Sequence, residues 1–214
     1  MRRMFKYLKK EYADSLLTMG LIRVGTLHDF RRADHKKGIT DQQEGKKKVK
    51  HAIPHLFVSD LDDPSVKKIE DNFPIKFGQN SLLENCAVAR EINHINCFIW
   101  CTSKISSAAT MQEFEEANAC IEIFNPQAFY DELTKTLNSK VSVTFRGVYP
   151  VIYQSREEEW NGIDWGLSPA LIKEPSFSQQ YEIRAIWEAS HGLPISPLIL
   201  CNSRLTAFCR SVKL

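Results

Sequence analysis

The stretch 97–103 reads CFIWCTS and decides the fold class. It is a compact apolar run of strand-forming residues between polar segments, which is typical of a buried central strand. Further apolar runs predict strands at 119–124 (ACIEIF), 141–153 (VSVTFRGVYPVIY), 181–188 (YEIRAIWE) and 197–203 (PLILCNS). Because few helical segments separate them, we expect an α+β fold. The chain then forms a single domain over residues 1–214, with a mainly antiparallel central sheet, continuous or split, and a few flanking helices.

The first thirty residues predict a strand, a helix and a second strand. FKYLK (5–9) is a short strand, and KEYADSLLTMG (10–20) places apolar residues at helical spacing before Gly20, a residue that suits a helix end. LIRVGTL (21–27) alternates like a strand. A second helix is expected over 126–137 (PQAFYDELTKTL), where the proline suits the first turn.

Residues 31–50 (RRADHKKGITDQQEGKKKVK) show no apolar periodicity and many charges, which indicates an exposed charged loop. Residues 51–77 contain two short apolar segments around a DDP turn or helix start. Their prolines and aspartates argue against one long element.

Composition excludes several classes of protein. Lys plus Arg exceed Asp plus Glu by 28 − 26 = +2, too little for a strongly basic nucleic-acid wrapper. No apolar stretch approaches the roughly 20 residues that span a bilayer, so we expect no membrane partner. Six cysteines lack CxxC spacing, and several lie in apolar runs. We therefore expect reduced thiols and a cytoplasmic protein. The oligomeric state stays open.

The charged loop carries one candidate site. Its carboxylates and imidazoles could hold Mg²⁺ or Mn²⁺ for phosphodiester hydrolysis, which makes a metal-dependent nuclease using residues 29–44 one hypothesis. The arginines of the same region are bidentate partners for phosphate and favour a pyrophosphate ligand instead. A solvated polar loop is the simpler alternative. The residues concerned are His28, Asp29, Asp34, His35, Asp41, Glu44, Arg23, Arg31 and Arg32.

Two strand ends carry further candidates. Thr102 and Ser103 close the CFIWCTS run, where small hydroxyl residues can approach a ligand or simply lead into a polar turn. Gln180, Glu182 and Arg184 alternate and therefore share one face of the strand predicted at 181–188. Such a row could be a water-exposed edge. It could also be a site in which Glu182 holds a ribose hydroxyl and stabilises positive charge at an anomeric carbon.

The segment from Trp160 to Trp165 offers a third hypothesis. Together with the basic loop, these aromatic residues could form the surface of a binding module without chemistry, which captures a nucleotide or a protein. Packing of the two tryptophans against the sheet is the alternative.

The order of these pieces resembles the layout of ADP-ribosyltransferase-like domains: strand, helix and strand in FKYLKKEYADSLLTMGLIRVGT, a strand ending in CTS, and a later strand opening with QYE. The resemblance implies that NAD⁺ is a substrate, that Ser103 sets the nicotinamide-side ribose, that Glu182 holds a ribose hydroxyl and that Gln180 orients the acceptor. It also implies a dinucleotide held by Tyr7, Arg23, Arg31, Thr102 and Arg184. The first-strand position that offers Arg or His in that superfamily reads FKYLK here. Lys6, Lys9 or Arg23 would therefore take that role.

The chain also resembles an uncharacterised family of bacterial and phage proteins, some of them associated with antiviral defence. The shared pattern is a KY strand near the start, a D-x-x-E-G segment (41–45), a CF strand, IEIF, VIY and a final E-x-R (182–184). We therefore expect an NAD-consuming enzyme, either an ADP-ribosyltransferase or an NAD glycohydrolase, in phage–host conflict. A protein or a nucleic acid would be the acceptor.

Overall fold

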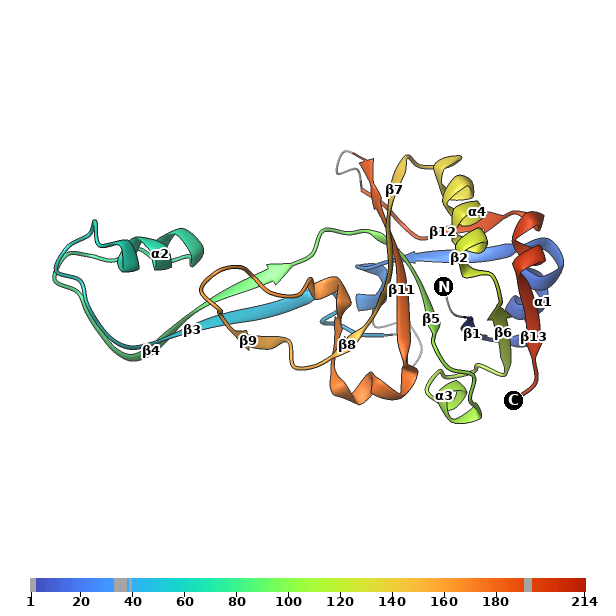
Figure 1. Ribbon diagram of the computed structural model, residues 1–214, viewed down its shortest axis with the longest axis horizontal. Helices are drawn as coiled ribbons and strands as arrows, with labels where there is room; N and C mark the ends of the chain where they lie inside the picture. The colour runs from blue at the N-terminus through green and yellow to red at the C-terminus, as the bar shows by residue number, and fades with distance from the viewer. Residues whose placement is uncertain (1–2, 33–37, 39, 191–193) are drawn as a thin grey trace.

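The computed structural model describes residues 3–32, 38, 40–190 and 194–214. Its main sheet runs in the order β12-β2-β5-β1-β6-β13, and β11 and β7 join it through β5. All of these neighbours are antiparallel, so the predicted α+β class with a mainly antiparallel sheet and few helices is confirmed (Figure 1). The strands are β1 (Met4–Leu8), β2 (Leu21–Thr26), β5 (Phe98–Ser103), β6 (Ala119–Ile123), β7 (Val143–Pro150), β11 (Glu182–Ala189), β12 (Leu198–Cys201) and β13 (Cys209–Val212).

Strand β5 is the centre of the sheet, as its apolar sequence predicts. Along one edge it pairs with β11 over its whole length, from Phe98 opposite Trp187 to Ser103 opposite Glu182. Its other edge is shared. β2 pairs only with Phe98 and Ile99, and β1 pairs only with Ser103. Between these contacts β1 and β2 diverge, so the sheet is split into a fork with β5 at its base.

Helix α1 (Lys10–Met19) connects the two arms of the fork, as predicted. It ends at Gly20, which has a φ of 65° and donates its N–H to the carbonyl of Leu16. The positive φ favours glycine at this position, and the packing around it requires glycine as well. A Cβ on Gly20 would lie 1.8 Å from the carbonyl oxygen of Asn202. The turn therefore brings the chain back into β2 immediately after the helix.

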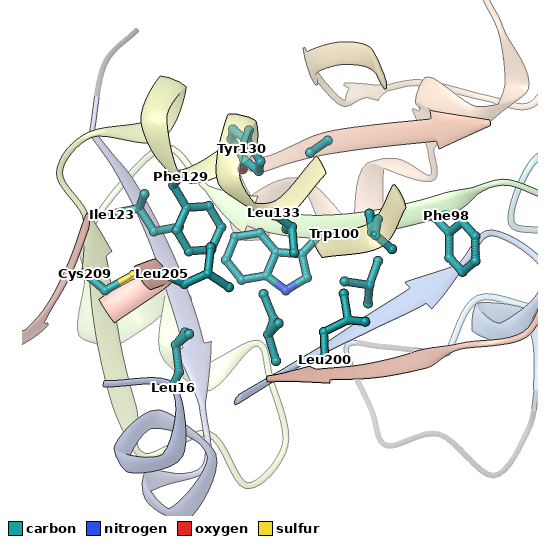
Figure 2. Packing of buried hydrophobic residues seen from close by; sticks show 14 of the residues in the cluster. Leu16, Phe98, Trp100, Ile123, Phe129, Tyr130, Leu133, Leu200, Leu205 and Cys209 are labelled. Atoms are coloured by element: carbon teal, nitrogen blue, oxygen red, sulfur yellow. The ribbon is translucent and has the colours of Figure 1, made fainter. Parts of the chain in front are cut away.

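The main hydrophobic core lies between the sheet and helix α4 (Pro126–Asn138). Asn125 caps this helix by accepting from the N–H of Ala128, and Pro126 occupies its first turn as expected. Figure 2 shows Phe129 and Leu133 of the helix packed around Trp100 of β5. The Trp100 and Phe129 ring centroids are 5.0 Å apart.

A long arm projects from the main sheet (Figure 1). It consists of β3 (Lys46–Phe57), β4 (Leu82–Asn93), helix α2 (Pro64–Asn72) between them, and the short strand β9 (Glu157–Glu159). The expectation of an exposed loop over 31–50 is wrong from Lys46 onward, whereas the helix start predicted at the DDP turn is confirmed by α2. From Lys46 onward β3 pairs with β4, and its lysines also face the acidic strand β9: Lys48 lies opposite Glu157 and Lys50 opposite Glu159. Two charge runs far apart in the sequence thus neutralise one another.

The two tryptophans of the 160–165 segment pack on this arm. Their rings stack 6.1 Å apart, and both contact Phe73 edge-on. Lys68 and Arg90 lie over the faces of Trp160 and Trp165. The packing alternative therefore holds for these residues, which form the core of the arm with Ile53 and Ile69.

The remaining elements are short and connect the larger ones. They are α3 (Ala108–Gln112), β8 (Ile152–Tyr153), β10 (Ile172–Lys173) and the 3-10 turns η1 (Asp29–Arg31), η2 (Pro169–Leu171), η3 (Pro175–Gln180) and η5 (Ser203–Phe208). Across the described ranges, no helix combines the length and apolar character needed to cross a membrane.

Candidate functional site

A cavity of about 620 Å³ opens in the fork between β1 and β2. This volume lies within the range of small-molecule and cofactor sites, about 300–1,000 Å³. Its walls come from Phe5–Lys9 of β1 and its end, Leu21–Arg23 of β2 and Ile99–Ser103 of β5. Glu182 and Arg184 complete the lining from β11, because they lie opposite Ser103 and Cys101 and share their face of the sheet.

A chain of buried charges crosses one wall of the cavity. Glu44 binds the Arg184 guanidinium through both carboxylate oxygens, at 2.7 and 2.9 Å. Arg184 Nε donates to Glu182 Oε1 at 2.7 Å, and Lys173 Nζ donates to Glu182 Oε2 at 2.8 Å. The same ammonium donates to Gln180 Oε1 at 2.8 Å. The exposed fractions of these five residues lie between 1% and 6%, so these interactions are shielded from solvent.

The surroundings of Glu182 determine its charge. Burial by itself would raise the pKa of this carboxyl, but the positive charges of Arg184 and Lys173 outweigh that cost. They hold the pKa of Glu182 well below its usual range. Glu182 is therefore ionised at neutral pH, and its two oxygens retain lone pairs beyond the two hydrogen bonds described.

Gln180 joins this chain of buried charges from a turn, whereas strand periodicity predicts that it lies on a strand. The expected strand over 181–188 starts one residue late, because Tyr181 adopts a left-handed conformation with a φ of 46°. Gln180 belongs to the preceding turn η3, so it is not on the strand at all. Its amide is held at both ends, by Lys173 and by the carbonyl of Gly38, to which Nε2 donates at 2.8 Å.

The opposite wall carries two cations. Lys6 of β1 donates to the carbonyl of Cys101 at 2.7 Å, and it forms no ion pair with any described residue. Burial lowers the pKa of its ammonium, although nearby Glu182 opposes this shift. Arg23 of β2 is half-exposed and pairs with Asp29 at 2.6 Å. An anion placed between Lys6 and Arg23 would restore the solvation that burial removes from Lys6.

Ser103 and Tyr7 line the cavity with hydroxyl groups that already form hydrogen bonds. Ser103 Oγ accepts from the N–H of Ile105 at 3.3 Å. The Tyr7 hydroxyl donates to the carbonyl of Ile105 and accepts from the N–H of Ser107, both at 2.9 Å. Thr102 is also part of the lining, but it lies opposite Ile183, and its hydroxyl donates to the carbonyl of Ile183 at 3.4 Å.

Arg31 does not line the cavity. Its Nε donates to the carbonyl of Glu44 at 2.6 Å, and its NH2 donates to Asn93 at the base of the arm. Arg31 therefore holds the segment that carries Glu44, and it lies outside the lining of the cavity.

The acidic loop does not gather its carboxylates. Asp29 pairs with Arg23, Asp41 pairs with Arg156 at 2.5 Å, and Glu44 pairs with Arg184. Asp34 and His35 lie outside the described residues. In the ranges that the structure describes, no three His, Cys, Asp or Glu side chains form a group that could hold a metal ion. Three arginines take up the charges that a divalent cation would need.

Sequence reasoning missed Lys173. It stands in an unremarkable segment, SPALIKEP, and no local pattern marks it. Asp41 and Glu44 are both buried beside arginines from distant parts of the chain. The D-x-x-E-G pattern that contains them was therefore a usable sequence signal for this part of the site. Comparison of the chain with protein-family models, curated proteins and solved structures finds no significant match.

Proposed function

We propose that this protein consumes NAD⁺, transferring ADP-ribose to an acceptor or to water, and that the fork cavity is its active site. The observation that carries the proposal is the ionised, buried Glu182 carboxylate in the wall of a dinucleotide-sized cavity, held in place by Arg184 and Lys173. The sequence resemblance to ADP-ribosyltransferase-like domains, given by the order of the motifs along the chain, supports the same proposal.

Glu182 has the properties that glycosidic cleavage of NAD⁺ requires. As nicotinamide leaves, positive charge develops on the anomeric carbon, and a fixed carboxylate stabilises that charge more than the ground state. A lone pair that Arg184 and Lys173 leave open can also accept from a ribose hydroxyl. Because the carboxylate is already oriented by two cations, little reorganisation is needed during the reaction.

The opposite wall suits the diphosphate of the dinucleotide. Lys6 contributes a positive charge without an ion-pair partner among the described residues, and Arg23 contributes a half-exposed guanidinium. Charge-assisted hydrogen bonds from such groups are the strong contacts in diphosphate recognition. In this proposal Lys6 takes the first-strand role that an Arg or His fills in the transferases.

The cysteines support a reducing compartment such as the cytoplasm for this activity. All six are free thiols, three of them buried as small apolar residues. The resemblance to bacterial and phage proteins of antiviral defence suggests phage–host conflict as the setting.

A nucleotide-binding module without turnover is the second candidate, and one observation favours it. Both oxygens of Glu182 already accept hydrogen bonds from protein cations, as they would in a purely structural ion-pair chain. This reading predicts binding of NAD⁺ or ADP-ribose without release of nicotinamide.

The test is incubation of the purified protein with NAD⁺, with and without cell lysate, followed by chromatography of nicotinamide. We expect release by the wild type and a loss of about 10²–10³-fold in kcat for Glu182→Gln, since removing one preorganised electrostatic group costs about that much. Equal release by wild type and variant would overturn the role of Glu182. Binding without release in both would select the second candidate.

Glu122→Gln is the matched control. Glu122 is a buried carboxylate of the same sheet, held by Arg3 and Arg210, and it does not line the cavity. It should keep wild-type activity. Comparing the two variants separates loss of chemistry from loss of a buried ion pair.

A further inference from the structure

Among the described residues of the lining, none near Glu182 is placed to remove a proton from an acceptor. Glu182 is held between two cations, and Glu44 is bound through both oxygens by Arg184. The described lining contains no histidine. Burial raises the pKa of the Cys101 thiol, so this group stays protonated at neutral pH and cannot accept a proton. A general base must be free to accept a proton, and none of these described groups is.

The other carboxylates that line the cavity lie away from Glu182. Glu115 and Glu116 follow α3 beyond the end of β1, where Glu116 pairs with Lys9 at 2.7 Å. Ser103 and Lys173, by contrast, flank Glu182 directly. The part of the cavity around the candidate catalytic carboxylate is therefore supplied with donors and cations.

We infer that the acceptor is a carboxylate that is already ionised, on a protein side chain or chain end. This inference rests on the proposed function and names its second substrate. A serine hydroxyl, a lysine ammonium or an arginine guanidinium must lose a proton when it is ADP-ribosylated, and the described lining around Glu182 offers no base for that step. A carboxylate needs none.

The reaction balances without proton transfer. The bond between the ribose anomeric carbon and the nicotinamide nitrogen breaks, and its electron pair leaves with nicotinamide. A lone pair of the carboxylate oxygen forms the new carbon–oxygen bond. The positive charge of the nicotinamide ring and the negative charge of the carboxylate cancel, so the products are an ADP-ribosyl ester and neutral nicotinamide.

Lys173 favours a carboxylate over a phosphate monoester. An ammonium has three N–H donors, and among the described residues Lys173 gives one to Gln180 and one to Glu182. The Phe177 ring lies 4.5 Å from the same nitrogen. One remaining N–H suits a monoanion, whereas the doubly charged phosphate would need a further cation, and Lys6 and Arg23 serve the diphosphate of the dinucleotide.

The experiment uses the full-length protein, NAD⁺ and four probes with blocked termini: a glutamate-containing peptide, its glutamine counterpart, an arginine- and lysine-containing peptide, and a 5′-phosphorylated oligonucleotide. Mass spectrometry identifies the modified probe, and a weakly buffered assay counts protons released per nicotinamide. Transfer to a carboxylate releases no proton, whereas hydrolysis releases one. Neutral hydroxylamine cleaves an ADP-ribosyl ester.

We expect a hydroxylamine-sensitive adduct on the glutamate peptide alone, with proton release per nicotinamide falling as that peptide is added. Adducts on the arginine and lysine peptide or on the oligonucleotide would overturn the inference. So would one proton per nicotinamide in every arm, which is hydrolysis only. Absence of nicotinamide release in all arms would instead refute the proposed function, so the two failures are distinguishable.

Discussion

Replacing Lys173 with methionine tests the buried charge chain most directly. In the wild type, the charges of Glu44, Arg184, Glu182 and Lys173 sum to zero, and Glu182 is only 6% exposed. In the Lys173→Met variant, loss of the ammonium leaves one net negative charge in this wall of the cavity. Breaking a buried ion pair by removing one partner lowers the free energy of unfolding by about 3–5 kcal/mol. We expect a loss of about 3 kcal/mol here, because Arg184 still binds Glu182. For a chain of this length that corresponds to a fall in Tm of roughly 6–12 °C.

The pH dependence of this loss has a definite sign. The pKa of Glu182 is depressed in the folded wild type. Its contribution to stability is therefore present above the unfolded value of about 4.3 and is lost as pH falls through the folded value. Without Lys173 the carboxyl protonates more readily in the folded state. Because the unfolded state contributes equally to both proteins, the difference in stability between wild type and variant should be full at pH 7 and should narrow once the pH falls below the folded-state pKa of Glu182 in the variant.

Urea unfolding followed by tryptophan fluorescence at pH 7 and pH 4 measures both effects. Lys47→Met is the control, since Lys47 is a buried lysine of the arm whose partner Glu158 is 26% exposed and can be rehydrated. We expect a smaller loss there, with little change between the two pH values. A loss for Lys173→Met that is under 1 kcal/mol, or that grows at pH 4, would refute the electrostatic account of this wall.

Three further experiments, two with substitutions and one with thiol labelling, test the scaffold. Gly20→Ala should lower the free energy of unfolding by more than the roughly 1–2 kcal/mol that a left-handed conformation costs a residue with a Cβ, because the new Cβ would meet the carbonyl of Asn202. Unchanged stability in urea unfolding would contradict this geometry of the turn. Leu133→Ala should cost about 2–5 kcal/mol by opening a cavity against Trp100, whereas exposed Ile199→Ala should cost little in the same assay. Timed thiol labelling with mass spectrometry at pH 8 should modify the exposed cysteines first and Cys97 last, since burial raises its pKa to about 12; early labelling of Cys97 would argue against its place in the core. The exposed cysteines are Cys86 and Cys201.

Local patterns determined much of the fold from the sequence alone. The apolar run at 97–103, the helix ending in Gly20 and the capped helix at 126–138 each form as predicted, because their signals are short-range. The exposed loop predicted over 31–50 fails from Lys46 onward for the opposite reason. There the lysine run is part of strand β3, which pairs with β4, and acidic residues more than one hundred positions later pair with it as well.

The same distinction applies to the candidate site. The sequence alone singled out Glu182, Ser103 and Arg184, since each stands at the end or along the face of a recognisable strand, and it singled out Gln180 by its spacing from Glu182, although that residue lies in a turn. Only the tertiary structure decided that Glu44 binds Arg184 across 140 positions of sequence and that Lys173 joins Glu182 to Gln180. Spacing in sequence specifies which residues share a strand face, but the charge state of Glu182 depends on cations that folding brings beside it in a medium that screens them weakly.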